Sequence, residues 1–251
     1  MKNLKYLLLI LLISSSCSMS PLHKASEAYK EKDFKEAFKR YKKSAELGDA
    51  TGMNLLGSMY YLGQGTLKDD KEAFKWYKKS AELGNDTAMA NLGAMYHGGK
   101  GTLKDYKEAF KWCKKAAEFG ISTGMNRLGS MYYGGEGTLK DYKEAFKWYK
   151  KSAELGDATG MNLLGSMYYL GQGTLKDDKE AFKWYKKSAE LELLGLGDTK
   201  GMLMLGVMYY RGQGTLKNPQ LAKYWIKKAY EAGNKDAEKA WNSLALWSAR
   251  P

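Results

Sequence analysis

The side chains that could carry out catalysis or hold a metal ion are few in this chain of 251 residues. It has two cysteines, Cys17 and Cys113, and two histidines, His23 and His97. Two cysteines exclude a scaffold held by several disulfides and a metal site built from several cysteines. Two histidines leave little material for acid–base chemistry near neutral pH. We therefore expect no catalytic residues, no metal site and no cofactor.

Two glycine motifs match phosphate-binding or catalytic loops only in part, and both are better explained as turns. The G-x-G of Gly63 and Gly65 lacks the preceding strand and the third glycine of a dinucleotide-binding loop, so it predicts a turn with positive φ. The G-x-S-x-G of residues 120–124 joins two helical patterns, and both histidines precede it. A nucleophile elbow instead follows a strand and has its histidine later in the chain. Neither motif indicates an enzyme.

The first 17 residues have the pattern of an export signal. Lys2 and Lys5 precede the apolar run 6–13, which is shorter than the roughly 20 residues that a helix needs to span a bilayer. The following stretch from Ser14 to Cys17 resembles the lipobox of bacterial lipoproteins, although that family prefers leucine where Ser14 stands. The resemblance implies lipid modification of Cys17 and a membrane-anchored protein on the periplasmic face or the cell surface. The alternative is ordinary cleavage in the serine run, which leaves a soluble periplasmic or secreted protein.

After a short linker at 18–21, the chain repeats one sequence of about 36 residues. One glycine recurs at the same place in each repeat, and its positions are Gly57, Gly93, Gly129, Gly165 and, after a longer gap, Gly206. Residues 41–83 recur without a change as residues 149–191. Self-similarity of this kind predicts a fold built by stacking copies of one supersecondary unit.

Each repeat contains two helical patterns. In the first, Met53, Leu56 and Gly57 lie on one stripe of an amphipathic helix. Glycine inside a helix costs about 1 kcal/mol relative to alanine, so its recurrence predicts that a neighbouring element approaches closely there. Asp69 and Gly84 are typical N-cap and C′ residues, and they mark the beginning and the end of the second helix.

Helix pairs that repeat at this period stack into an α-solenoid, because no single pair can bury its own apolar stripe. We therefore expect an all-α fold, a right-handed α-solenoid of stacked antiparallel helix pairs. The segment LGSMYYLGQGTLKDDKEAFKWYKKSAELG closely resembles the Sel1-like repeat, a relative of the tetratricopeptide repeat. The resemblance implies five Sel1-like repeats over 49–233, a short tetratricopeptide-like unit at 22–48, and a C-terminal capping helix and tail at 234–251.

The net charge of +13 comes mainly from lysine. The lysines recur on the outer face of each second helix, which is typical of a solvated surface. Weak affinity for anionic surfaces, such as lipid headgroups, cell-wall polymers or an acidic protein, is the second interpretation. Proteins that bind nucleic acid favour arginine over lysine at their contacts. An exported protein is also separated from most of the cell's DNA and RNA. We therefore expect no nucleic-acid partner.

The resemblance implies a non-catalytic protein–protein interaction scaffold or adaptor in the bacterial cell envelope, with its partner in the concave groove that first helices line in such solenoids. Positions off the core of the first helix vary between repeats while core positions barely change, although ordinary surface drift gives the same contrast. The candidate partner-facing residues are Asn54, Asn91, Asn126, Arg127, Ser130 and Asn162.

The alternative is an enzyme, because one cysteine-rich Sel1-like family is described as binding or hydrolysing β-lactams. That family carries a cysteine pair in each repeat, whereas Cys113 stands alone in the repeats of this chain. The S-x-x-K motif of serine β-lactamases is also missing from the sequence. We therefore expect a binding protein that is not an enzyme.

Overall fold

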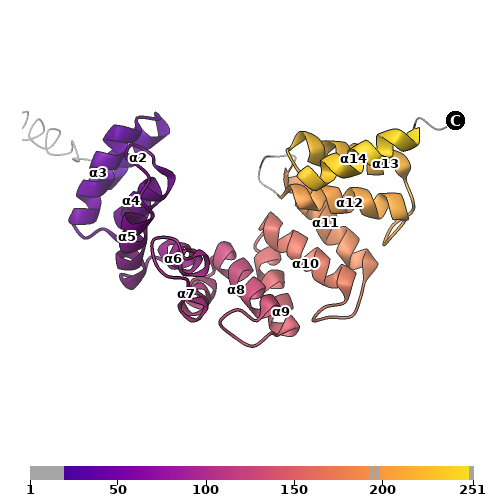
Figure 1. Ribbon diagram of the computed structural model, residues 1–251, viewed down its shortest axis with the longest axis horizontal. Coiled ribbons are helices and arrows are strands. Elements are labelled where there is room, and N and C mark those ends of the chain that lie inside the picture. The colour runs from indigo at the N-terminus through magenta and orange to yellow at the C-terminus, as the bar shows by residue number, and fades with distance from the viewer. Residues whose placement is uncertain (1–19, 193–194, 196–197, 249–251) are drawn as a thin grey trace, which may run out of the picture. The chain divides into compact units, whose positions relative to one another are not determined.

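The computed structural model describes residues 20–192, residue 195 and residues 198–248, and within them every regular element is a helix (Figure 1). Cys17 and the export signal predicted for residues 1–17 lie outside these residues. In the part of the chain that the structure describes, no helix has the length and apolar character needed to cross a bilayer.

The helices form two compact units. The first unit reaches Met95 and includes residues 99–103, and the second contains residues 96–98 and the chain from residue 104 onward. The helices of the first unit are α2 Pro21–Lys30, α3 Phe34–Glu46, α4 Ala50–Leu62, α5 Asp70–Glu82 and most of α6 Asp86–Gly98. Those of the second are α7 Tyr106–Glu118, α8 Ser122–Gly134, α9 Tyr142–Glu154, α10 Ala158–Leu170, α11 Asp178–Glu192, α12 Thr199–Arg211, α13 Pro219–Glu231 and α14 Lys235–Ser248.

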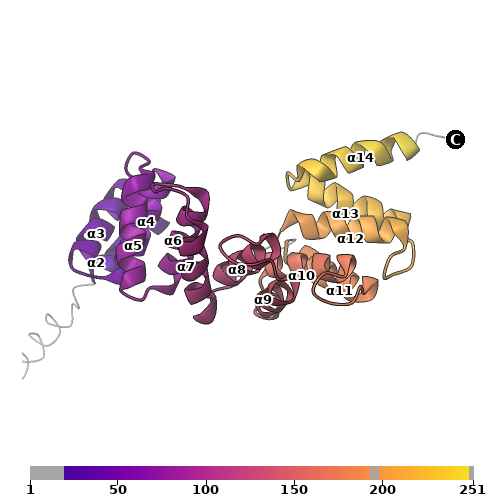
Figure 2. The ribbon, with the colours of Figure 1, turned by 60° about the horizontal axis from the view of Figure 1, so that its bottom comes forward.

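Within the second compact unit, each helix packs against the one before it and the one after it. Figure 2 shows this stacking clearly at the C-terminal end, where α13 lies between α12 and α14. The first helices of successive repeats also meet directly, since α10 contacts both α8 and α12. This confirms the expected class, an all-α solenoid of stacked helix pairs.

The helices begin directly after the aspartates that the sequence predicts as N-caps. Asp141 is the N-cap of α9, and its Oδ1 accepts hydrogen bonds from the backbone N–H groups of Lys143 and Glu144 at 2.9 and 3.1 Å. Asp157 caps α10 in the same way, through the N–H of Gly160 at 2.7 Å. These bonds satisfy amide groups that the first turn of a helix leaves without a partner.

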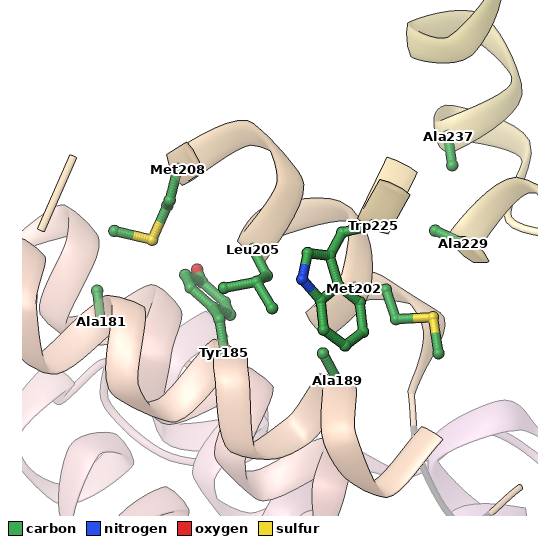
Figure 3. Close-up of a cluster of buried hydrophobic side chains, with 9 residues drawn as sticks. All are labelled: Ala181, Tyr185, Ala189, Met202, Leu205, Met208, Trp225, Ala229 and Ala237. Carbon is green, nitrogen blue, oxygen red and sulfur yellow. The ribbon is translucent and has the colours of Figure 1, made fainter. Parts of the chain in front are cut away.

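The core lies between the two layers of helices, and Figure 3 shows it at the C-terminal end. Leu205 of α12 is fully buried and lies between the rings of Tyr185 from α11 and Trp225 from α13. Met202 and Met208 flank Leu205 on the same helix. The apolar stripe of a first helix is thus covered by the second helices on both sides of it, as stacking requires.

The glycine inside the first helix allows a tyrosine ring to approach the backbone. A Cβ atom built on Gly129 of α8 would lie 2.6 Å from Cε1 of Tyr149 in α9. At Gly165 the corresponding distance to Cε1 of Tyr185 is 3.0 Å. The close approach predicted from the recurrence of this glycine is therefore confirmed.

The loop between the two helices of a repeat lies against the preceding repeat. Gly173, with a φ of +71°, comes so close to the carbonyl oxygen of Tyr142 that a Cβ atom there would overlap it. Beside it, the Tyr133 hydroxyl donates a hydrogen bond of 2.8 Å to Oε1 of Gln172. Each loop therefore joins two repeats as well as two helices.

The lysines of the second helices are exposed and interact with their own helix. In α9, Lys147 Nζ lies 3.1 Å from Oε1 of Glu144, and Lys151 Nζ lies 4.3 Å from the centre of the Trp148 ring. Exposed pairs of this kind contribute little to stability, usually below about 1 kcal/mol. These contacts suit a solvated face.

Candidate functional site

Three of the predicted partner-facing residues tie one repeat to the next. In the first compact unit, Nδ2 of Asn91 donates a hydrogen bond of 3.1 Å to Oδ1 of Asn54. In the second, Nδ2 of Asn162 donates to Oδ2 of Asp198, the N-cap of α12, at 3.4 Å. Asn54 and Asn162 are buried. Their contact with a partner stays a prediction, and their side-chain amides already have partners in the chain.

The other three predicted residues, Asn126, Arg127 and Ser130, come together on one side of α8. They border a pocket of about 440 Å³ in the second compact unit. Its wall consists of His97, Cys113, Thr123, Asn126, Arg127, Ser130, Met131, Asp157, Thr159 and Leu163. We take this pocket as the candidate site.

The pocket combines an apolar wall with polar groups. Cys113 of α7 and Met131 of α8 are buried, and Leu163 of α10 is half-buried beside them. The polar groups come mainly from α8 and from the beginning of α10. Across the described ranges, no group of three His, Cys, Asp or Glu side chains could hold a metal ion. The arrangement suits the binding of an organic group.

Asn126 contributes a buried polar atom to the wall. Its Nδ2 donates a hydrogen bond of 2.7 Å to Oδ1 of Asp157, the carboxylate that caps α10. Its Oδ1 is buried and has no hydrogen-bond partner among the described residues. A buried carbonyl oxygen without a donor costs about 1–3 kcal/mol, so this atom is a place where a bound donor would be favourable.

Arg127 is the cation of the pocket. Its side chain is exposed and makes no hydrogen bond or ion pair within the described part of the chain. By contrast, Arg40 pairs with Glu36 at 2.7 Å, and Arg211 donates to the Tyr169 hydroxyl at 3.2 Å. Of the six predicted residues, Arg127 has the side chain that is available to a partner.

Cys113 is held as a neutral thiol. Burial raises its pKa to about 11, and the nearby Arg127 guanidinium offsets part of this rise. A thiol with such a pKa carries very little thiolate at neutral pH and is a poor nucleophile. Cys113 therefore acts in the wall as an apolar, polarizable group.

The side chain of His97, in the pocket wall, contacts the side chain of Glu136. His97 Nε2 lies 2.7 Å from Oε2 of Glu136, and the His97 ring meets Tyr106 edge to face with 5.3 Å between the ring centres. At the equivalent place one repeat later, Tyr133 bonds Gln172. The tyrosine and the glutamine of that junction are thus both exchanged here, and the side-chain contact is kept.

The residues that distinguish this part of the chain from the other repeats converge on the pocket. His97 replaces a tyrosine, Cys113 replaces a tyrosine, and Arg127 stands where other repeats have Leu55, Asn91, Leu163 and Met204. All three line the one pocket. Sequence reasoning singled out Arg127 and considered His97 and Cys113 only as candidates for catalysis or metal binding. The signal that could have joined them is their departure from an otherwise regular repeat in consecutive helices.

Comparison with known proteins identifies the repeat. The family model for the Sel1 repeat matches residues 25–49, 50–85, 86–119, 122–157, 158–193 and 199–234. The crystal structure of a Sel1 repeat protein from Oxalobacter formigenes is similar at 37% identity and a TM-score of 0.81, over 89% of each chain. No curated protein matches the chain.

Two further crystal structures are similar. One is c5321, a protective antigen present in uropathogenic Escherichia coli strains and displaying an SLR fold, with 33% identity and a TM-score of 0.77. The match covers 94% of this chain and 50% of that protein, so this chain spans half the length of c5321. A sel1 repeat protein from Klebsiella pneumoniae, at 21% identity and a TM-score of 0.56, shares the fold over 83% of this chain and 99% of its own.

Proposed function

Because the chain belongs to the Sel1 repeat family, we propose that it is a non-catalytic scaffold that binds a protein partner at the pocket beside Arg127. The Sel1 repeat is a protein-interaction fold, and the proteins built from it generally mediate contacts between proteins. The pocket is the surface of this chain at which we expect such a contact.

The observation that carries the proposal is the convergence of His97, Cys113 and Arg127 on one pocket. The repeats of this chain are so alike that residues 41–83 and 149–191 are identical. Three departures from the repeat that meet at one surface support a role for that surface beyond packing. Arginine is also enriched among the residues that dominate binding between proteins.

Arg127→Glu is expected to weaken capture of the partner on the order of tenfold or more, because the substitution puts a carboxylate where a free guanidinium now meets the partner. The measurement is a crosslinking pull-down from envelope fractions, followed by titration of the captured protein. Lys114→Glu is the matched control, since Lys114 is exposed on α7 away from the pocket wall and its exchange changes the net charge equally. Equal capture by wild type and Arg127→Glu would contradict the proposal.

We further propose that the scaffold is exported and anchored through a lipid on Cys17. The support is the lipobox-like sequence that ends at Cys17 and the similarity to the protective antigen c5321. Metabolic labelling with a fatty-acid analogue should mark the wild-type chain, and the label should disappear in Cys17→Ala. The matched control is Cys113→Ala, which should keep its label. Label that persists in Cys17→Ala would exclude the anchor.

A further inference from the structure

A tyrosine ring is a regular part of the Sel1 repeats of this chain. In the repeat of α8 and α9, Tyr149 is buried with its ring against the backbone of Gly129, and its hydroxyl is 3.0 Å from Oγ of Ser130. Tyr77 is placed in the same way, with its hydroxyl 3.0 Å from Oγ of Ser58. Ring and hydroxyl thus fill one defined place beside the first helix.

The repeat of α6 and α7 lacks both parts of this arrangement. Cys113 stands in the register of Tyr149, and Ala94 stands in the register of Ser130. A six-membered ring with its hydroxyl is therefore replaced by a thiol, and the serine that would bond the hydroxyl is replaced by a methyl group. Cys113 is also the residue of α7 that borders the pocket. The pocket therefore borders a residue that is a thiol here and a tyrosine in the adjacent repeats.

The chemistry around this place suits an aromatic ring with a hydroxyl. The sulfur atoms of Cys113 and Met131 are favourable neighbours for a ring edge. The free Arg127 guanidinium can lie over a ring face, and arginine is the side chain that does so most often. The unpartnered Oδ1 of Asn126, on a side chain of a residue only 8% exposed, can accept a hydrogen bond from a phenol.

We propose that the pocket takes a tyrosine side chain of the partner, whose ring lies against Cys113 and beside Arg127. The inference rests on the proposed function, and it adds the kind of side chain that the partner presents. The Arg127 side chain is able to adjust to the bound ring, because no hydrogen bond or ion pair of the described residues holds it.

The test uses p-cresol, which is the tyrosine side chain without its backbone, and the full chain with ¹³C-labelled methionine methyl groups. In the wild type, p-cresol should shift the Met131 signal, which Met131→Leu assigns, in a saturable way. In the double variant Ala94→Ser/Cys113→Tyr, which restores the residues of the other repeats, the apparent affinity should fall at least tenfold. Met208, buried in another part of the same compact unit, is the internal control and should not move.

Two results would overturn the inference. The first is a wild-type Met131 signal that does not respond to p-cresol, and this result does not depend on the folding of the double variant. The second is a folded double variant that binds p-cresol as well as the wild type does. If the partner is captured through Arg127 and the double variant captures it equally well, the tyrosine site is wrong while the scaffold function stands. If p-cresol binds as expected and Arg127→Glu leaves capture unchanged, the scaffold function is wrong instead.

Discussion

Gly173→Ala should lower the free energy of unfolding of the second compact unit by about 3 kcal/mol. Two costs add at this position. A side chain at a φ of +71° is strained, and its Cβ would overlap the carbonyl oxygen of Tyr142, so the loop must leave the preceding repeat. The loss would appear in urea unfolding followed by circular dichroism, as a lower midpoint for the transition of this unit.

The matched control is Gly156→Ala. Gly156 also has a positive φ, +87°, but a Cβ there would have no atom within 4 Å. It therefore carries the conformational cost alone, about 1 kcal/mol. Equal losses from the two substitutions would show that the contact between the loop and the preceding repeat contributes nothing to stability.

Leu128→Ala should cost about 3 kcal/mol, because it leaves a cavity in a packed core. Leu128 is fully buried on α8 in a cluster with Met125, Met131 and Trp148. The same unfolding measurement applies. Leu139→Ala is the control, since Leu139 is 88% exposed in the following loop and its loss should change stability by less than about 0.5 kcal/mol. A Leu128→Ala protein as stable as its control would mean that the helix stripe is not the core of the repeat.

The fold was accessible from the sequence because its determinants are local and occur several times. Asp141 predicts the beginning of α9 through bonds to residues two and three positions later, and Gly129 predicts a close approach through its place inside a helix. The same pattern occurs in several repeats, and each occurrence supports the same prediction. Helix bounds and stacking therefore follow from the residues themselves.

The site was accessible only in part, because its contacts join residues that are far apart in the chain. Arg127 stands out as a variable cation on a first helix, but whether it has a partner depends on the neighbouring helices. Asn126 and Asn162 vary in the same way, and the structure shows that they bond Asp157 and Asp198, which are 31 and 36 residues away. Periodicity reveals which helix face a residue occupies, but it does not show which polar groups meet there.

The position of Cys113, Arg127 and His97 around one pocket could not be predicted from the sequence for the same reason. Each departs from the repeat by a single exchange, and each exchange alone is compatible with packing. Their common place becomes visible only when α7, α8 and the end of α6 are seen to border one volume. The paired exchange at His97 and Glu136 could have pointed there, because both ends of one junction change together.

The identity of residues 41–83 and 149–191 also has a consequence for how the gene can change during evolution. Coding stretches for identical residues can recombine where their nucleotide sequences match, and the shorter product would lack three whole repeats. Both ends of the deletion fall at the same point of the repeat, so the new junction would have the loop contact and the tyrosine–glutamine bond found elsewhere. His97, Cys113 and Arg127 all lie within the deleted stretch. A single deletion can therefore remove the pocket and leave a shorter scaffold in which the contacts between repeats are kept.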